Sequence, residues 1–182
     1  MSTKSDYILK LLNVVSWIIF IGVCIEAGAF IVNTFFTLLL NPEGAKRFWM
    51  EVNLSELYYY NQSYYVTVTS LMIIVAVLRA LMFYHIVKFL NNKELRLSQP
   101  FNETTRRFIL KIAYMGLGIG LFSFWGAKVA EGLVKQGVRM PEIQYLRLGG
   151  ADVWLFLGVI LLVIAQIFKR GIEIQNEIDL TV

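Results

Sequence analysis

The sequence predicts an all-α fold, an integral membrane four-helix bundle, from its composition, its long apolar stretches and the charges that flank them. Of its 182 residues, 57% are hydrophobic and 16% are charged, against roughly 45–50% and 25% in soluble domains. Such an excess of apolar side chains is expected where lipid covers most of the surface. The length leaves room for a single domain, residues 1–182, with short connections.

Four apolar stretches reach or approach the length needed to cross a bilayer. They lie at Leu11–Leu40, Tyr65–Val87, Phe108–Ala130 and about 152–168. The hydrocarbon core is about 30 Å thick and a helix rises 1.5 Å per residue, so a span needs about 20 apolar residues. The first stretch exceeds this length, so it is expected to remain uncleaved and to tilt or project beyond the membrane. The Pro and Gly at residues 41–44 are expected to end it.

The connections differ in composition. Ala45–Tyr64 is rich in Tyr and Trp, which gather where lipid headgroups meet water, so a partly helical interfacial segment is predicted. The next connection, residues 88–107, is basic and contains a predicted turn at residues 98–102. Asn102 at the end of that turn is expected to cap the third helix. The third connection covers residues 131–150.

Lys and Arg are distributed unequally between the two sides. Nine lie in the N-terminal segment, the second connection and the C-terminal tail, and five lie in the first and third connections. Because cytoplasmic segments carry the excess of Lys and Arg, both termini are predicted to be cytoplasmic. The same bias explains the net charge of +4 without any direct contact with nucleic acid.

Two charged residues lie deep inside the apolar stretches, Glu26 in the first and Arg79 in the second. An unpaired charge at this depth costs at least about 2.5–3.5 kcal/mol on insertion scales, so such residues usually have a partner or a function. We expect a contact between Glu26 and Arg79, direct or through a polar neighbour. It is either a buried pair that fixes helix register or a proton or ligand site.

Other charges lie nearer the ends of the stretches. Lys111 and Lys128 are close to opposite ends of the third stretch, where their stems can reach the headgroups. Glu131 follows Lys128 by three residues and lies on the same helix face. Asp152 opens the fourth stretch and is another possible partner of Lys128. These charges are expected to act mainly as interfacial anchors.

Gly116-x-x-x-Gly120 places two glycines on one face of the third helix. Without side chains at these positions, another helix can approach closely. The pattern supports packing within the bundle and leaves open a homo-oligomer formed through this face.

Several kinds of chemistry are excluded by composition. Cys24 is the only cysteine and His85 the only histidine, so the chain cannot form an internal disulfide, a CxxC centre or a bis-histidine haem site. No catalytic Ser-His-Asp arrangement and no zinc motif is apparent. We therefore expect no cofactor, no metal and no enzymatic activity.

The C-terminal tail follows Lys169 and Arg170, which end the fourth span. Gly171 permits a bend, and the isoleucines of residues 172–182 alternate with acidic residues in a short amphipathic segment. This segment is expected either to dock back on the bundle or to bind a cytoplasmic partner.

The tail from Ile167 to Val182, the turn Pro100-Phe101-Asn102 and the segment Ile25-Glu26-Ala27-Gly28 together resemble a bacterial membrane family catalogued as domain of unknown function 2975. The resemblance implies a four-helix, multi-pass protein of the bacterial inner membrane. It also implies a gene often found beside one for a small helix-turn-helix regulator, a possible cytoplasmic partner. The family has no established activity.

The function predicted from these features is regulatory, sensing or protective. The protein would sense the state of the envelope or an external agent through its two outer connections and report through the basic connection and the tail. The alternative is a small transporter or channel subunit with a polar path near Glu26 and Arg79. An intramembrane enzyme acting on a lipid or quinone is a third possibility. A continuous polar cavity reaching Glu26 would favour transport, and a closed bundle with a distinctive surface would favour binding.

Overall fold

The computed structural model describes residues 4–50, 52–91 and 101–179, in which all regular secondary structure is helical. The elements are α1 (Lys4–Leu39), the 3-10 helix η1 (Pro42–Arg47), α2 (Ser55–Tyr60), α3 (Gln62–Leu90), α4 (Glu103–Lys135) and α5 (Ala151–Asp179). Four of these helices, α1, α3, α4 and α5, are long and apolar enough to cross a membrane. The predicted number and order of the spans are therefore confirmed.

Asparagine side chains fix where several helices begin. The Asn102 side chain accepts a hydrogen bond from the Thr105 amide at 2.7 Å, as predicted, and starts α4 before its apolar stretch. The Asn61 side chain accepts from the Ser63 amide at 2.8 Å and starts α3 in the same way. The predicted turn at residues 98–102 lies mostly outside the described residues.

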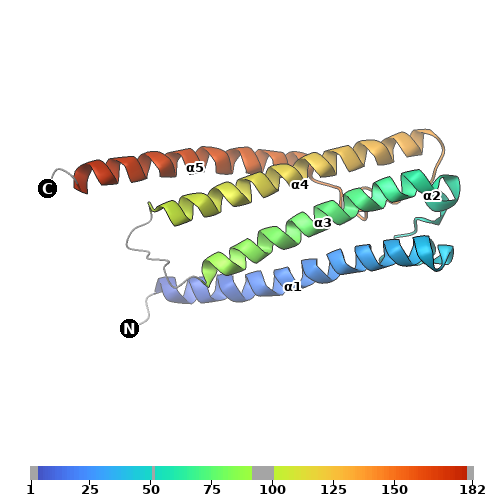
Figure 1. The fold of residues 1–182 in the computed structure, drawn as a ribbon, viewed down its shortest axis with the longest axis horizontal. Helices are drawn as coiled ribbons and strands as arrows, with labels where there is room; N and C mark the ends of the chain where they lie inside the picture. The colour runs from blue at the N-terminus through green and yellow to red at the C-terminus, as the bar shows by residue number, and fades with distance from the viewer. Residues whose placement is uncertain (1–3, 51, 92–100, 180–182) are drawn as a thin grey trace.

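The four long helices pack in an open row in the order α1, α3, α4, α5 (Figure 1). Among the described residues, no backbone contact joins α1 to α4 or α5, so the expected bundle does not close into a ring. In their most apolar windows, 39% of α3 and 28% of α4 residues are buried, against 6% of α1 and 11% of α5. A row is stable here because lipid can cover the outer faces of α1 and α5.

The described residues at both chain ends, Lys4 and Asp179, lie at one end of the row with the last turn of α3 and the first turn of α4 (Figure 1). We call this the termini end. The opposite end carries η1, α2 and the last turn of α4, and we call it the α2 end. This arrangement follows from four consecutive antiparallel crossings.

The connection between α4 and α5, residues 136–150, turns back beside α4 before α5 begins (Figure 1). The Leu148 side chain lies against Gly126, which is nine residues, or about 13 Å of helix, before α4 ends at Lys135. Leu146 and Leu148 are both fully buried. Non-helical backbone at this level is tolerated because it is covered by protein.

The α2 end is closed by an aromatic cluster. Phe30, Phe48 and Tyr65 are fully buried, and the rings of Phe30 and Phe48 lie 5.7 Å apart. The predicted interfacial segment is partly helical, as η1 and α2 show. Its aromatics divide between this core and the surface, where Tyr59 and Tyr60 are exposed. An amphipathic ring suits either position, so composition alone did not separate them.

The tail continues α5 without a break. Helix α5 runs through Gly171 to Asp179, so the bend that Gly171 permits does not occur. Phe101 packs against Gly171 and against Phe168, with ring centroids 5.2 Å apart. Ile174 is exposed. The Ile178 side chain and residues 180–182, which belong to the predicted amphipathic segment, lie outside the described part of the chain.

Candidate functional site

A charged cluster lies in the interior of the row, where α1, α3 and the connection before α5 meet. Glu26 of α1 forms an ion pair with Arg147 of that connection, with 3.1 Å between Oε1 and Nε. The Glu26 side chain is only 17% exposed, whereas that of Arg147 is 44% exposed. The contact is ionic, since Glu26 Oε1 has no hydrogen-bond partner among the described residues. This oxygen can therefore accept a further donor.

Arg147 is held in place by its neighbours in the chain. It lies between the fully buried Leu146 and Leu148, and its own backbone has φ +59°. This left-handed conformation costs an ordinary residue about 1–2 kcal/mol. Its amide donates to the Gln144 carbonyl at 3.0 Å, and that of Leu148 donates to the Ile143 carbonyl at 3.1 Å. Burial of the two leucines thus presents the guanidinium to α1.

Arg79 of α3 faces the same place. With Val23, Ala76, Glu26 and Arg147 it lines a cavity of about 130 Å³. Its guanidinium lies 5.7 Å from the centre of the Trp154 ring, within range of a cation–π interaction. The Arg79 Nε is buried and has no hydrogen-bond partner among the described residues.

The predicted pair is therefore part of a larger group. Glu26 and Arg79 line one cavity, but the ion pair of Glu26 is with Arg147. Sequence reasoning missed Arg147 because it assigned this residue to an outer connection. The available signal was the order Leu146-Arg147-Leu148, a charge between two apolar residues that are expected to be buried together.

The register of α1 against α3 explains why Glu26 and Arg79 share a level. Near the termini end, the Asn13 side chain donates to that of Asn91 at 2.7 Å. About two turns further along both helices, the Phe20 and Tyr84 rings lie 6.2 Å apart. In an antiparallel pair this register continues to Glu26 opposite Arg79. Both residues lie well inside their apolar stretches, so they lie within the spanning parts of α1 and α3.

The cavity holds two guanidinium groups and one carboxylate. Intramembrane charges are retained where they pair with one another or serve a pathway or ligand. Among the residues that line the cavity one positive charge is in excess, and the Arg79 guanidinium lies against the Trp154 ring. The arrangement can hold an anion or ordered water, or it can couple the three segments mechanically.

The other predicted charges lie near the ends of α4 and α5. Lys128 donates to Glu131 at 2.9 Å, on the helix face predicted for this pair. The ion pair of Lys128 is with Glu131 and not with Asp152, which opens α5. Lys111 is exposed near the termini end and lines a different pocket.

The two glycines of the third span face α5. A Cβ on Gly120 would lie 2.7 Å from Leu155 Cγ, whereas one on Gly116 would lie 3.6 Å from the Trp154 carbonyl oxygen. Both glycines are buried by this contact. The face they form is therefore used within the chain and is not available to a second copy.

Larger pockets gather at the α2 end around the connection. A pocket of about 550 Å³ lies between the last turns of α4 and residues 140–144, and its lining includes Val134, Met140 and Ile143. A second, of about 360 Å³, shares Met140 and reaches Glu56 of α2. Nearby, Lys46 donates to Glu43 at 2.6 Å and holds the pKa of that carboxyl below its ordinary value.

Within the described residues, no group of three or more His, Cys, Asp or Glu side chains could hold a metal ion. Cys24 is exposed on α1.

The fold and the cluster define a class of protein, a multi-pass helical membrane protein with a charged site inside its spans. Residues 40–182 match the family model described as "Protein of unknown function (DUF2975)", and the chain belongs to this family. The match includes Arg79 and Arg147 but not Glu26, so it covers less of the chain than the resemblance in α1 indicated. Neither a search of curated proteins nor a search of solved structures found a match.

Proposed function

We propose that this protein is a non-enzymatic membrane sensor in which a signal at the α2 end is transmitted to α1 through the ion pair between Arg147 and Glu26. The observation that carries the proposal is this ion pair, because it joins a surface-connected segment to a spanning helix. Residues 136–150 line the pockets at the α2 end and also hold Arg147. An occupant of those pockets would therefore displace the connection and Arg147 together.

Helix α1 is suited to respond to such a displacement. In its most apolar window only 6% of residues are buried, and among the long helices it packs on α3 alone, so it can tilt without displacing α4 or α5. Its far end contacts α3 through the hydrogen bond between Asn13 and Asn91. A displacement of Arg147 would therefore change the contact between Asn13 and Asn91 at the termini end.

The orientation that fits this role places the termini end in the cytoplasm of a bacterial cell and the α2 end outside the inner membrane. The excess of Lys and Arg on the side of the termini supports it. The tail of α5 and the basic connection would then face a cytoplasmic protein partner. A helix-turn-helix regulator is the partner class we propose, and tagged pull-down with and without residues 172–179 tests it.

Because the ligand is unknown, the test uses a larger side chain to fill the pockets at the α2 end. Met140→Trp adds volume where both pockets meet, and Asn13→Cys with Asn91→Cys, in a Cys24→Ser background, reports on the far end of α1. We expect Met140→Trp to change the rate of disulfide formation at least about threefold, a coupling in the usual range for linked sites. The change should disappear when Arg147→Gln is added.

Leu121→Trp is the matched control, since Leu121 is 60% exposed on α4, away from the pockets. It should leave the rate of disulfide formation unchanged. If Met140→Trp has no effect, or if its effect persists fully without Arg147, the connection does not signal through Glu26 and the proposal fails.

Transport is the second candidate, and the cavity at Glu26, Arg79 and Arg147 favours it. Its excess positive charge would select an anion. Chloride flux from proteoliposomes separates the two functions. A sensor gives no flux above that of protein-free vesicles, whereas a flux abolished by Arg79→Gln would establish transport and overturn the sensor.

A further inference from the structure

We propose that a basic pocket between α3 and α4 at the termini end binds the phosphate of an anionic phospholipid. The pocket has a volume of about 280 Å³ and is lined by three cationic side chains, Lys88, Arg107 and Lys111. His85 and the Thr104 hydroxyl also line it. It is separate from the Glu26 cavity, and the proposal does not depend on the sensor function.

The packing of α3 on α4 brings these cations together. The Phe89 and Phe108 rings stack at 3.9 Å with an interplanar angle of 4°, which sets the two helices at one level. Lys88 and Arg107 immediately precede these two rings in the sequence. Lys111 follows Arg107 by four residues, so it lies on the same face of α4 one turn further on.

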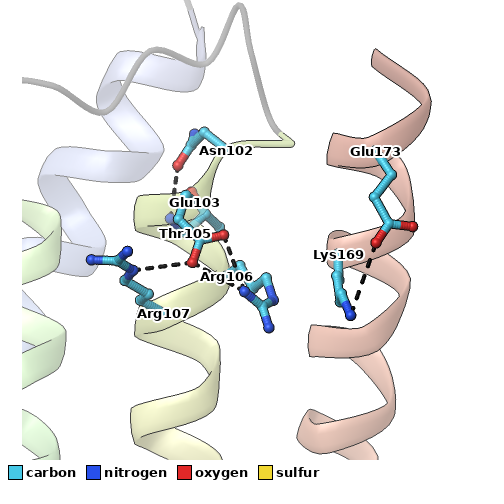
Figure 2. Close-up of polar contacts among 7 residues, drawn as sticks. All are labelled: Asn102, Glu103, Thr105, Arg106, Arg107, Lys169 and Glu173. Atoms are coloured by element: carbon cyan, nitrogen blue, oxygen red, sulfur yellow. Dashed lines mark hydrogen bonds and ion pairs between the residues drawn. The ribbon is translucent and has the colours of Figure 1, made fainter. Parts of the chain in front are cut away.

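The pocket keeps a positive excess. Arg107 donates from Nε to Glu103 at 3.0 Å, but Glu103 also accepts from Arg106 at 3.0 Å, so one carboxylate is shared by two guanidinium groups. Figure 2 shows Arg107 and Arg106 reaching Glu103 from opposite sides of the carboxylate. Within the part of the chain that the structure describes, neither Lys88 nor Lys111 forms an ion pair. Both side chains are exposed, and the Lys88 Nζ lies 6.0 Å from the centre of the Tyr84 ring, a contact that leaves its positive charge available to an anion.

Depth and surroundings favour a lipid as the source of that anion. Lys88 lies in the last turn of α3, where its apolar stretch ends, and Thr104 lies in the first turn of α4. This is the level of phospholipid phosphates when the apolar stretches fill the hydrocarbon core. Basic pockets between spanning helices on the cytoplasmic side are suited to anionic headgroups. The Phe89 and Phe108 rings add an apolar wall that a glycerolipid can contact and that inorganic phosphate cannot use.

The proposal is tested by titrating the full-length protein with phosphatidylglycerol and counting bound lipids by native mass spectrometry. Each cation near a headgroup strengthens binding about fivefold, so Lys88→Gln with Lys111→Gln should weaken it about twentyfold or more. Lys128→Gln with Lys135→Gln removes the same charge from the other end of α4 and should change the affinity less than twofold. Phosphatidylcholine should bind equally to all three proteins.

Folding is checked for each variant by its thermal unfolding midpoint, and the two single variants, each expected to lose about fivefold, replace the double variant if it unfolds. Lys88→Arg with Lys111→Arg keeps the charge and should retain binding. Equal loss in both double Gln variants would overturn the proposal, because it would reflect net charge alone. Displacement of phosphatidylglycerol by millimolar inorganic phosphate would also overturn it, because the site would then take a soluble anion.

Discussion

Glu26 carries a negative charge that faces two arginine side chains, so the cluster holds more positive than negative charge. The Arg147 guanidinium is in ionic contact with Glu26, and Arg79 lines the same cavity. Removing the carboxylate leaves two cations without a counter-charge. Removing Arg147 leaves Glu26 and Arg79 in one cavity, so one negative and one positive charge remain. Loss of Glu26 should therefore lower the free energy of unfolding more than loss of Arg147.

We predict that Glu26→Gln destabilises the protein by about 2–4 kcal/mol and Arg147→Gln by about 1 kcal/mol or less, since an uncompensated intramembrane charge costs about 2.5–3.5 kcal/mol. Thermal or chaotrope unfolding in lipid nanodiscs measures the difference. Glu131→Gln, which breaks an exposed pair with Lys128, is the control and should cost under about 1 kcal/mol. If Glu26→Gln cost no more than Glu131→Gln, the cluster would not stabilise the fold.

At the scale of elements, α4 is one of the two inner helices of the row, because it packs on both α3 and α5. Its glycines are not equivalent, although the sequence pattern pairs two of them. Gly120 leaves no room for a Cβ, since the Leu155 backbone nitrogen would lie 3.0 Å away. Gly116 has room for one at ordinary contact distance. The two helices therefore approach closely at Gly120, and again at Gly158 of α5, where a Cβ would lie 3.0 Å from the Leu117 backbone nitrogen.

Gly120→Ala is expected to destabilise the protein by about 1–3 kcal/mol through overpacking against α5. Gly116→Ala should be nearly neutral. A Cβ added at Gly132 would have no neighbour within 4 Å. Gly132→Ala should therefore stabilise the protein by about 0.5–1 kcal/mol, because Ala loses less backbone freedom than Gly when the helix forms. The thermal unfolding midpoint in detergent, measured for each of the three variants, checks this order of stability. An equal loss in Gly116→Ala and Gly120→Ala would contradict the packing described for α4 and α5.

At the scale of the whole molecule, the row of helices places both described chain ends and the basic pocket at one end and the larger pockets around α2 at the other (Figure 1). The connection between α4 and α5 turns back beside α4 and carries Arg147 to Glu26, between these two ends. The proposed sensing and lipid sites are therefore at opposite ends of the molecule, with the Glu26 cluster between them.

The orientation of the whole molecule is tested with single cysteines in a Cys24→Ser background. A membrane-impermeant maleimide should label Lys135→Cys, at the α2 end, in right-side-out vesicles. Lys169→Cys, near the termini end, should react only after permeabilisation, because positive charge is retained on the cytoplasmic side. Labelling in the reverse pattern would place the termini outside and would refute the proposed direction of signalling.

The amino-acid sequence by itself determined the number and order of the four long apolar helices and the Asn102 cap. These features depend on local properties, namely runs of apolar side chains and the first turn of a helix. Glu26 and Arg79 could also be singled out, because charges are rare in such runs. The sequence also supported membership of the family.

Only the tertiary structure decided which side chains meet. The open row, the position of α5 against Gly120 and the return of residues 136–150 alongside α4 all depend on packing between distant segments. Hydropathy assigned Arg147 to an outer connection, because periodicity cannot show that two buried leucines draw that connection between the helices. Glu26 therefore has a partner that only the tertiary structure revealed.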